Sequence, residues 1–243
     1  MEPEQTLQAR DSDERYFLRC GPAATAAVKS SLHLAVRPHL HDVRAMLRLP
    51  LPALGITAGC NFAAVHVLLN VISGLSRLLG PSETNSRKAF TTFVRRWYPW
   101  REEPRGARYR QTRGTATLYE GFRTGFAHDL GLLLEGTATP KPNIQRFRFR
   151  VHGDNLGVSK EPTLSPARLR ELDEVTRRPP WLGPTIDPGP SGPLIDAVAL
   201  YWGVRRAVFD YTSSPRATRS FDRMIQDTWD RRKAAGRITT YSG

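Results

Sequence analysis

The chain has 243 residues, of which 40% are hydrophobic, so it is long enough to bury a core in one large or two small domains. It carries 36 Lys and Arg against 23 Asp and Glu, and this net charge of +13 favours polyanionic partners such as nucleic acids. The acidic opening MEPEQTLQARDSDERYF contains no signal-peptide core, and Cys20 and Cys60 form neither a disulfide framework nor a metal-ligand spacing. A cytoplasmic protein is therefore expected.

Helical periodicity dominates the first half of the chain and predicts an antiparallel bundle. The expected helices cover 22–48, with a break near Pro38, then 56–80, 84–98, and a fourth from near Thr115 to near Gly136. Asn85 or Thr84 is expected to cap the third helix. The fold class predicted from this pattern is mainly α: a helical bundle with a small β-hairpin and C-terminal helices.

The stretch between Arg48 and Arg77 carries no formal charge and is long enough to cross a bilayer. Two faces nevertheless separate on a helical wheel. The polar face holds His66, Asn70, Ser73 and Arg77. The apolar face holds Val65, Leu68, Leu69, Ile72, Leu75 and Leu79. This amphipathicity favours a bundle helix over a membrane span, so no membrane partner is expected.

The second half of the chain changes in character after the linker TATPKPN. IQRFRFRV (144–151) alternates with period two, and we expect it to form a β-hairpin with LGVSKE (156–161). A helix over 165–177, an irregular Pro- and Gly-rich loop, and helices over 193–213 and about 215–234 follow. The expected organisation is a loosely packed tail (1–15), a helical bundle (16–136), a linker with the hairpin (137–163) and a C-terminal helical region that packs on the bundle (164–243).

The fourth helix carries two side chains that a plain core helix does not need. Arg123 and His128 flank Gly125 in LYEGFRTGFAHDLGLLLEG (Leu118–Gly136). Imidazole transfers protons near neutral pH, and guanidinium holds phosphate oxygens. Together they suit metal-free RNA cleavage, in which the 2′-hydroxyl attacks the adjacent phosphate. The alternative is structural: Arg123 pairs with Glu120 or Asp129, and His128 bonds a backbone carbonyl.

The sequence predicts no cofactor. His39 and His41 are close to each other, but no Cys, Asp or Glu stands at a spacing that would complete a zinc site with them.

The segment Arg123-Thr-Gly-Phe-Ala-His128 resembles the Arg-x(4–6)-His motif of the HEPN superfamily (higher eukaryotes and prokaryotes nucleotide-binding). Its form is similar to the R-N-G-L-V-H or R-C-G-L-A-H of many bacterial HEPN-like proteins. As in those proteins, an apolar helix with a Cys near its start (GCNFAAVHVLLNVISGL) and a basic, aromatic helix (SRKAFTTFVRRWYPW) precede it. The resemblance covers about residues 16–136.

This resemblance implies an all-helical homodimer in which two copies of the motif line one cleft. It implies a metal-independent endoribonuclease, of the kind found among toxins and defence effectors, with an antitoxin or regulatory protein as a further partner. His128 would be the acid and base and Arg123 the phosphate contact. Thr124 stands where active members often carry Asn, Asp or His, and its hydroxyl can still bond a phosphate. The alternative function is a catalytically inactive HEPN-like dimer that binds or regulates.

Basic residues flank the motif on both sides and are expected to bind single-stranded RNA. They are Arg95, Arg96, Arg101, Arg105, Arg108, Arg110, Arg113, Arg148 and Arg150. The aromatic residues among them either stack unpaired bases or cap the bundle core, namely Trp97, Tyr98, Trp100 and Tyr109. In a third hypothesis the C-terminal helices bind DNA, but the acids Asp222, Asp227 and Asp230 would repel a phosphate chain.

Overall fold

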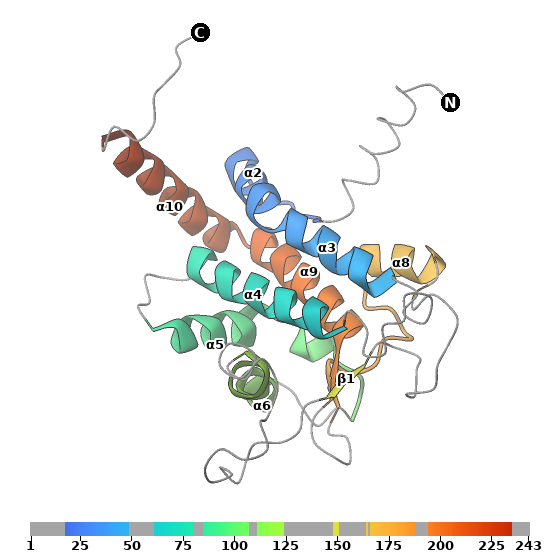
Figure 1. Ribbon diagram of the computed structural model, residues 1–243. Coiled ribbons are helices and arrows are strands. Elements are labelled where there is room, and N and C mark those ends of the chain that lie inside the picture. Colours follow the sequence, from blue (N-terminus) through green and yellow to red (C-terminus); the bar gives the residue numbers. More distant parts are fainter. Residues whose placement is uncertain are drawn as a thin grey trace, which may run out of the picture.

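The computed structural model is a bundle of helices around one buried helix, α9 (Figure 1). It describes residues 18–48, 61–79, 85–106, 111–123, 148–150, 164, 166–187 and 194–234. The helices around α9 (Ala197–Ser213) come from both halves of the chain: α3 (Arg37–Arg48), α4 (Asn61–Leu79), α5 (Ser86–Trp97) and α10 (Pro215–Ala234). The chain is therefore mainly helical, and its C-terminal helices share one hydrophobic core with the N-terminal ones. The predicted divisions after residues 15, 136 and 163 lie outside the described residues.

The first half of helix α9, Ala197–Val204, is buried because its sequence is apolar on all sides. Every side chain from Ala197 to Arg205 is buried. Asp196 caps the helix by accepting hydrogen bonds from the backbone N–H groups of Val198 and Ala199, both at 2.9 Å. This helix was expected to begin at residue 193, but it begins at 197 because the preceding residues form a strand.

The first predicted helix consists of two, α2 (Ala26–Ala35) and α3. They meet at Val36, close to the predicted break, and Pro38 lies in the first turn of α3, where its missing N–H costs nothing. The Thr25 side chain caps α2 by accepting from the backbone N–H of Val28 at 3.2 Å.

Helix α4 confirms its predicted amphipathicity, because its predicted apolar face is buried as far as the side chains are described. Among the described residues, no helix combines the length and the apolar character that crossing a bilayer requires. Helix α5 is capped by the Asn85 side chain, one of the two predicted caps.

The fourth predicted helix begins earlier than expected and is not a single α-helix. After the short 3₁₀ turn η2 (Trp100–Glu102), α6 (Gln111–Ala116) runs into a π-helix, η3 (Thr117–Arg123). Gly114 allows α6 to lie against Trp100, because a Cβ at Gly114 would stand 2.4 Å from that ring. This contact lies between residues distant in sequence, so the periodicity of the helix did not reveal it.

A three-stranded sheet in the order β1-β3-β2 lies beside the helices. The predicted strand is present as β1 (Arg148–Arg150), and it pairs in parallel with β3 (Leu194–Asp196). A small antiparallel pair is formed by β3 and β2 (Ile186–Asp187). Strand β2 lies in the loop that was expected to be irregular, and β3 lies where the start of a helix was expected. The expected partner, 156–161, lies outside the described residues. The hairpin of 144–151 with this partner therefore stays a prediction. The parallel pair of β1 and β3 was not expected, because it needs a long crossover that no local turn signal announces.

Helix α8 (Pro166–Asp173) lies within the predicted 165–177 and begins with its proline, whose missing N–H is not needed there. Helix α10 covers the predicted 215–234.

Candidate nucleic-acid interface

The π-helix η3 fixes Arg123 through the residues before it. Leu118 and Phe122 are buried against the core, as the apolar stripe predicted. Tyr119 packs on Phe90 of α5, with 5.3 Å between ring centroids. The guanidinium of the half-buried Arg123 lies 5.6 Å from the centre of the Tyr119 ring.

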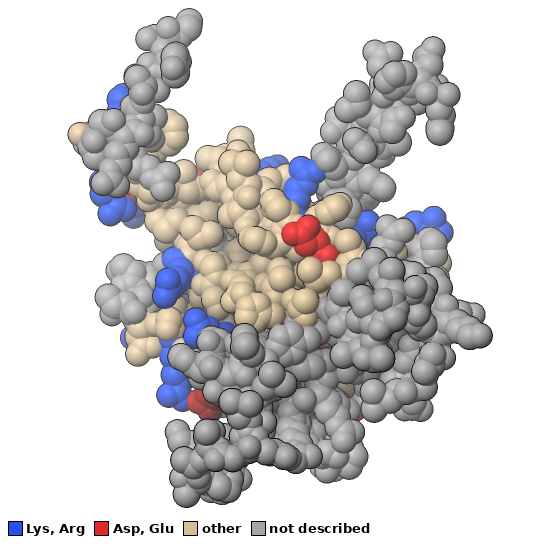
Figure 2. Space-filling model, in the orientation of Figure 1, with Lys and Arg blue, Asp and Glu red and all other residues tan. Residues whose placement is uncertain are grey.

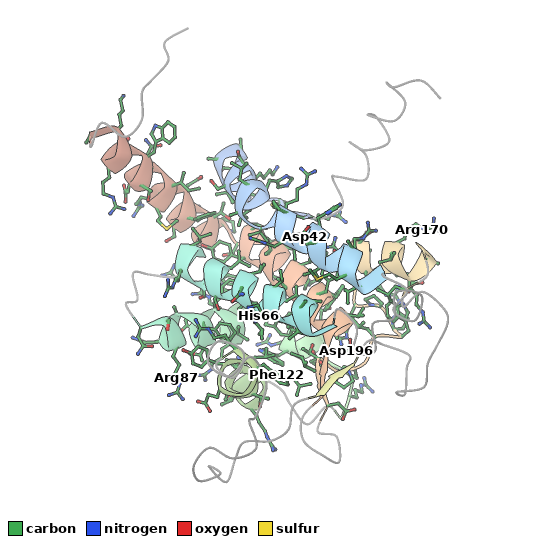
Figure 3. The ribbon with its side chains drawn as sticks, in the orientation of Figure 1. Asp42, His66, Arg87, Phe122, Arg170 and Asp196 are labelled. Atoms are coloured by element: carbon green, nitrogen blue, oxygen red, sulfur yellow. The ribbon has the colours of Figure 1, made fainter. Side chains whose placement is uncertain are left out.

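This stacking covers one face of a planar guanidinium and leaves the N–H groups in its plane able to bind an anion. Glu120, a predicted partner of Arg123, is paired with Arg87 instead, which lies on α5 beside the helix that carries Phe122 (Figure 3). No carboxylate within the described ranges pairs with Arg123. Short π-helical segments occur often at functional sites, and this one leads directly into the predicted motif.

The two acids of the basic loop between α5 and α6 point inward. Glu103 is buried, and its carboxylate accepts hydrogen bonds from the backbone N–H and the hydroxyl of Thr185, at 3.0 and 2.6 Å. An Arg178 Nη1 lies 3.6 Å from the same carboxylate. Glu102 is half-buried, and its carboxylate lies 3.0 Å from Nη2 of Arg206 on α9. Both acids therefore neutralise Arg178 and Arg206, and they do not pair with the arginines of the loop that face solvent.

The arginines of this region remain exposed. Arg95 and Arg96 lie at the end of α5, Arg101 lies in η2, and Arg105 lies in the turn after it. None of these four forms an ion pair with a carboxylate of the described ranges. Arg113 on α6 is also exposed. In Figure 2, Lys and Arg side chains gather along the side where α10, the end of α4 and α5 lie.

The aromatic residues between these arginines belong to the core. Tyr98 and Trp100 are each only 4% exposed, and the Trp100 indole donates to the carbonyl of Val94 at 3.1 Å. Trp97 packs edge-on against Tyr211 of α9, at 5.1 Å between centroids. Burial raises the pKa of the Tyr98 phenol, and the nearby Glu103 carboxylate raises it further. Base stacking by Tyr98 and Trp100 is therefore excluded, and the alternative that they cap the core is correct.

Several predicted site residues lie outside the described residues. They include both remaining motif positions, Thr124 and His128, and the loop residues Arg108, Tyr109 and Arg110. The backbones of Arg148 and Arg150 lie in β1, but their side chains are not described. The structure therefore describes Arg123 and five of the predicted basic residues, whereas the second residue of the motif, His128, lies outside the described residues.

The remaining sequence candidates show no sign of a metal or redox site. His39 and His41 lie on α3, with an imidazole nitrogen of His41 3.9 Å from Asp42. Cys20 is half-buried, and burial raises the pKa of its thiol, which works against a reactive thiolate. Within the part of the chain that the structure describes, no three His, Cys, Asp or Glu side chains are placed to hold a metal ion.

A cavity of about 210 Å³ lies between α4 and the junction of α2 with α3. Val36, Val67 and Val71 line it, together with His39 and Asn70. Its lining contains no Lys or Arg, so it does not fit a phosphate.

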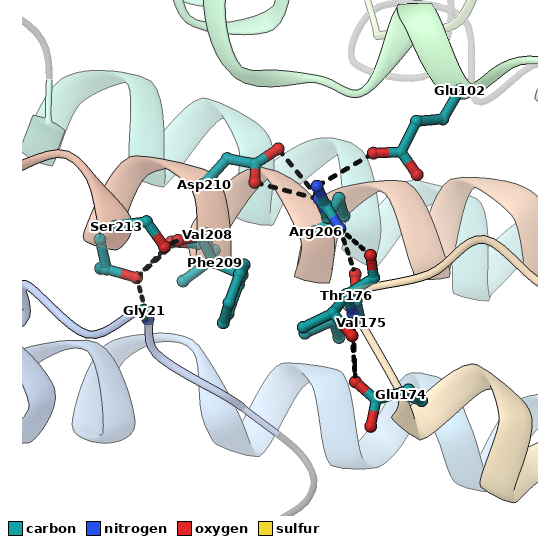
Figure 4. A network of polar contacts seen from close by, with 11 residues as sticks. Gly21, Glu102, Glu174, Val175, Thr176, Arg206, Val208, Phe209, Asp210 and Ser213 are labelled. Atoms are coloured by element: carbon teal, nitrogen blue, oxygen red, sulfur yellow. Dashed lines mark hydrogen bonds and ion pairs between the residues drawn. The ribbon is translucent and has the colours of Figure 1, made fainter.

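Sequence reasoning missed the polar groups that join α9 to its surroundings. Arg206 donates to the carbonyls of Val175 and Thr176 at 2.9 and 2.6 Å and to Asp210 at 3.0 Å, in addition to its pair with Glu102 (Figure 4). The adjacent Arg205 is fully buried and donates to the Leu172 carbonyl at 2.6 Å. The signal was present as two arginines in the apolar run ALYWGVRRAVF. These contacts hold the 99–105 loop and the chain after α8 against the core.

Comparison of the chain with protein-family models, with curated proteins and with solved structures found no match.

Proposed function

We propose that this chain is a metal-independent endoribonuclease of the HEPN type that acts on single-stranded RNA. The observation that carries the proposal is the segment from α5 to η3. Its arginines 95, 96, 101 and 105 face solvent while Glu102 and Glu103 point inward, and the segment ends in Arg123 stacked on Tyr119. Such a surface holds a phosphate chain electrostatically and leads it toward the motif.

In this mechanism Arg123 binds the scissile phosphate with the N–H groups that its stacking leaves available. His128 removes the proton from the 2′-hydroxyl, and the 2′-oxygen attacks phosphorus. The bond from phosphorus to the 5′-oxygen breaks, and the leaving oxygen takes up a proton from the imidazolium. The products are a 2′,3′-cyclic phosphate and a 5′-hydroxyl. The Arg123 guanidinium offsets the charge that develops on the phosphate oxygens, and the Thr124 hydroxyl is a further donor to them.

The proposal includes a homodimer whose two motifs share one cleft, which the resemblance of the motif to HEPN proteins implies. An interface of this kind makes the mass in solution that of two chains. Light scattering on the purified protein measures it, and a monomer at the concentrations used for cleavage would contradict this part of the proposal.

The test is cleavage of labelled single-stranded RNA in EDTA. We expect the parent protein to cleave and the His128→Ala variant to lose cleavage by at least about a hundredfold, the contribution typical of a general acid or base. His41→Ala is the matched control, because it removes an imidazole from an exposed position on α3. Loss of cleavage by the parent protein in EDTA would refute the metal-free mechanism. Binding without cleavage in all three proteins would favour the inactive, binding form of the fold.

A further inference from the structure

Helix α10 carries a row of three arginines that lie outside the proposed nuclease site. Arg216, Arg219 and Arg223 are exposed, and spacings of three and four residues place them on one face of the helix. The row extends over roughly 10 Å at 1.5 Å per residue. None of the three pairs with a carboxylate in the parts of the chain described.

The acids of α10 do not interrupt this row. Asp222 lies three residues after Arg219, at the edge of this face, and its carboxylate accepts a hydrogen bond from the Thr25 hydroxyl, which also caps α2, at 2.7 Å. Asp227 and Asp230 lie one turn or more beyond Arg223, and Asp230 accepts from Gln226 at 3.1 Å. The repulsion expected from Asp227 and Asp230 therefore falls on the far end of α10, while the first turns carry three exposed arginines against the half-buried Asp222.

The first turns of α10 are also held firmly against the bundle. Phe221 is buried, and the Tyr211 hydroxyl of α9 donates to the carbonyl of Ala217 at 3.0 Å. Tyr211 packs in turn against Trp97, which follows the exposed Arg96 at the end of α5. Tyr211 thus links the start of the arginine row to the end of α5.

We infer that the first three turns of α10 bind the phosphate backbone of single-stranded RNA, as a second contact surface apart from the motif. The inference rests on the proposed function for the identity of the polyanion. A row of guanidiniums that pair with no carboxylate of the described ranges, on a helix packed against the bundle, fits successive phosphates and reads no base, so binding through it is independent of sequence and sensitive to salt.

The test compares two triple variants in a His128→Ala background, in which the RNA stays intact. One is Arg216→Gln/Arg219→Gln/Arg223→Gln. The matched control is Lys29→Gln/Arg170→Gln/Arg177→Gln. It removes the same charge from three exposed residues that lie outside α10. Fluorescence anisotropy with a labelled oligouridine gives the Kd over a range of salt concentrations. Circular dichroism verifies that both variants fold.

For single strands, each phosphate contact adds about 0.7 to the magnitude of the slope of log K against log salt concentration. Near 0.15 M salt, the loss of one such contact therefore raises Kd roughly fourfold. We therefore expect the α10 variant to bind about fiftyfold more weakly than its parent, with a slope smaller by about 2. The control variant keeps nearly the parent slope. Equal slopes in the α10 variant and its parent would overturn the inference and leave the proposed nuclease intact. Absence of oligouridine binding by the parent protein would contradict the proposed function itself.

Discussion

Replacing Arg206 tests how the structure holds its basic loop. Arg206→Leu removes two hydrogen bonds to the carbonyls of Val175 and Thr176 and the ion pairs with Glu102 and Asp210 (Figure 4). Hydrogen bonds from a charged donor contribute about 1.5 to 3 kcal/mol each. Partly exposed ion pairs contribute at most about 1 kcal/mol each. Because such terms overlap, we expect a loss of about 3 to 5 kcal/mol in the free energy of unfolding.

Urea denaturation followed by circular dichroism measures this loss, and at this chain length it corresponds to a decrease in Tm of about 6 to 20 °C. Arg206→Lys is the matched variant, because it keeps the charge but cannot reach four acceptors with a planar fork. We expect it to restore less than half of the lost stability. A destabilisation below about 1 kcal/mol in Arg206→Leu would refute the reasoning, since it would mean that these contacts do not hold the loop to α9.

The remaining predictions concern packing, pH and RNA affinity. Gly203→Ala places a Cβ 2.3 Å from the Tyr98 ring and should cost about 1 to 3 kcal/mol in urea unfolding, whereas Gly74→Ala, which meets nothing within 4 Å, should stabilise α4 by up to about 1 kcal/mol; equal effects would contradict the packing. Desolvation raises the pKa of Glu102 above 4.5, so the folded protein binds the proton of this carboxyl more tightly than the unfolded chain does. The stability gained from this proton is complete below pH 4.5 and is lost as pH rises through the raised pKa. In urea unfolding over a pH series, the Glu102→Gln variant should lack this loss of stability, and a pH dependence equal to that of the parent protein would exclude Glu102 as its source. Arg101→Gln/Arg105→Gln should reduce the salt slope of RNA binding by about 1.4, measured by anisotropy, and an unchanged slope would place the RNA elsewhere.

Local chemistry was sufficient to predict most of the helices. The Asn85 cap, Pro166 at the start of α8 and the limits of α10 follow from residues next to the helix ends, so they could be read from the sequence. The amphipathic faces of α4 were predictable for the same reason, because both lie within one periodic segment.

Contacts between distant residues were not predictable in this way. Tyr98 is buried because Gly203 leaves room for its ring, and Trp100 because Gly114 does, so no pattern around the aromatic residues reveals their burial. Glu102 and Glu103 point inward because their partners lie on α9 and after α8. The basic surface could therefore be predicted in composition, whereas the inward orientation of its acids came only from the structure.

The most direct test of the central claim, that Arg123 and His128 cleave RNA through its own 2′-hydroxyl, is the fate of a substrate that carries this group at only one position. An oligonucleotide with a single ribonucleotide in a DNA strand should be cut by the parent protein in EDTA only after that ribonucleotide, leaving a 2′,3′-cyclic phosphate detectable by mass spectrometry. The all-deoxy strand should bind and remain intact. Cleavage of the all-deoxy strand at a similar rate, or cleavage of the mixed strand at other positions, would contradict the mechanism.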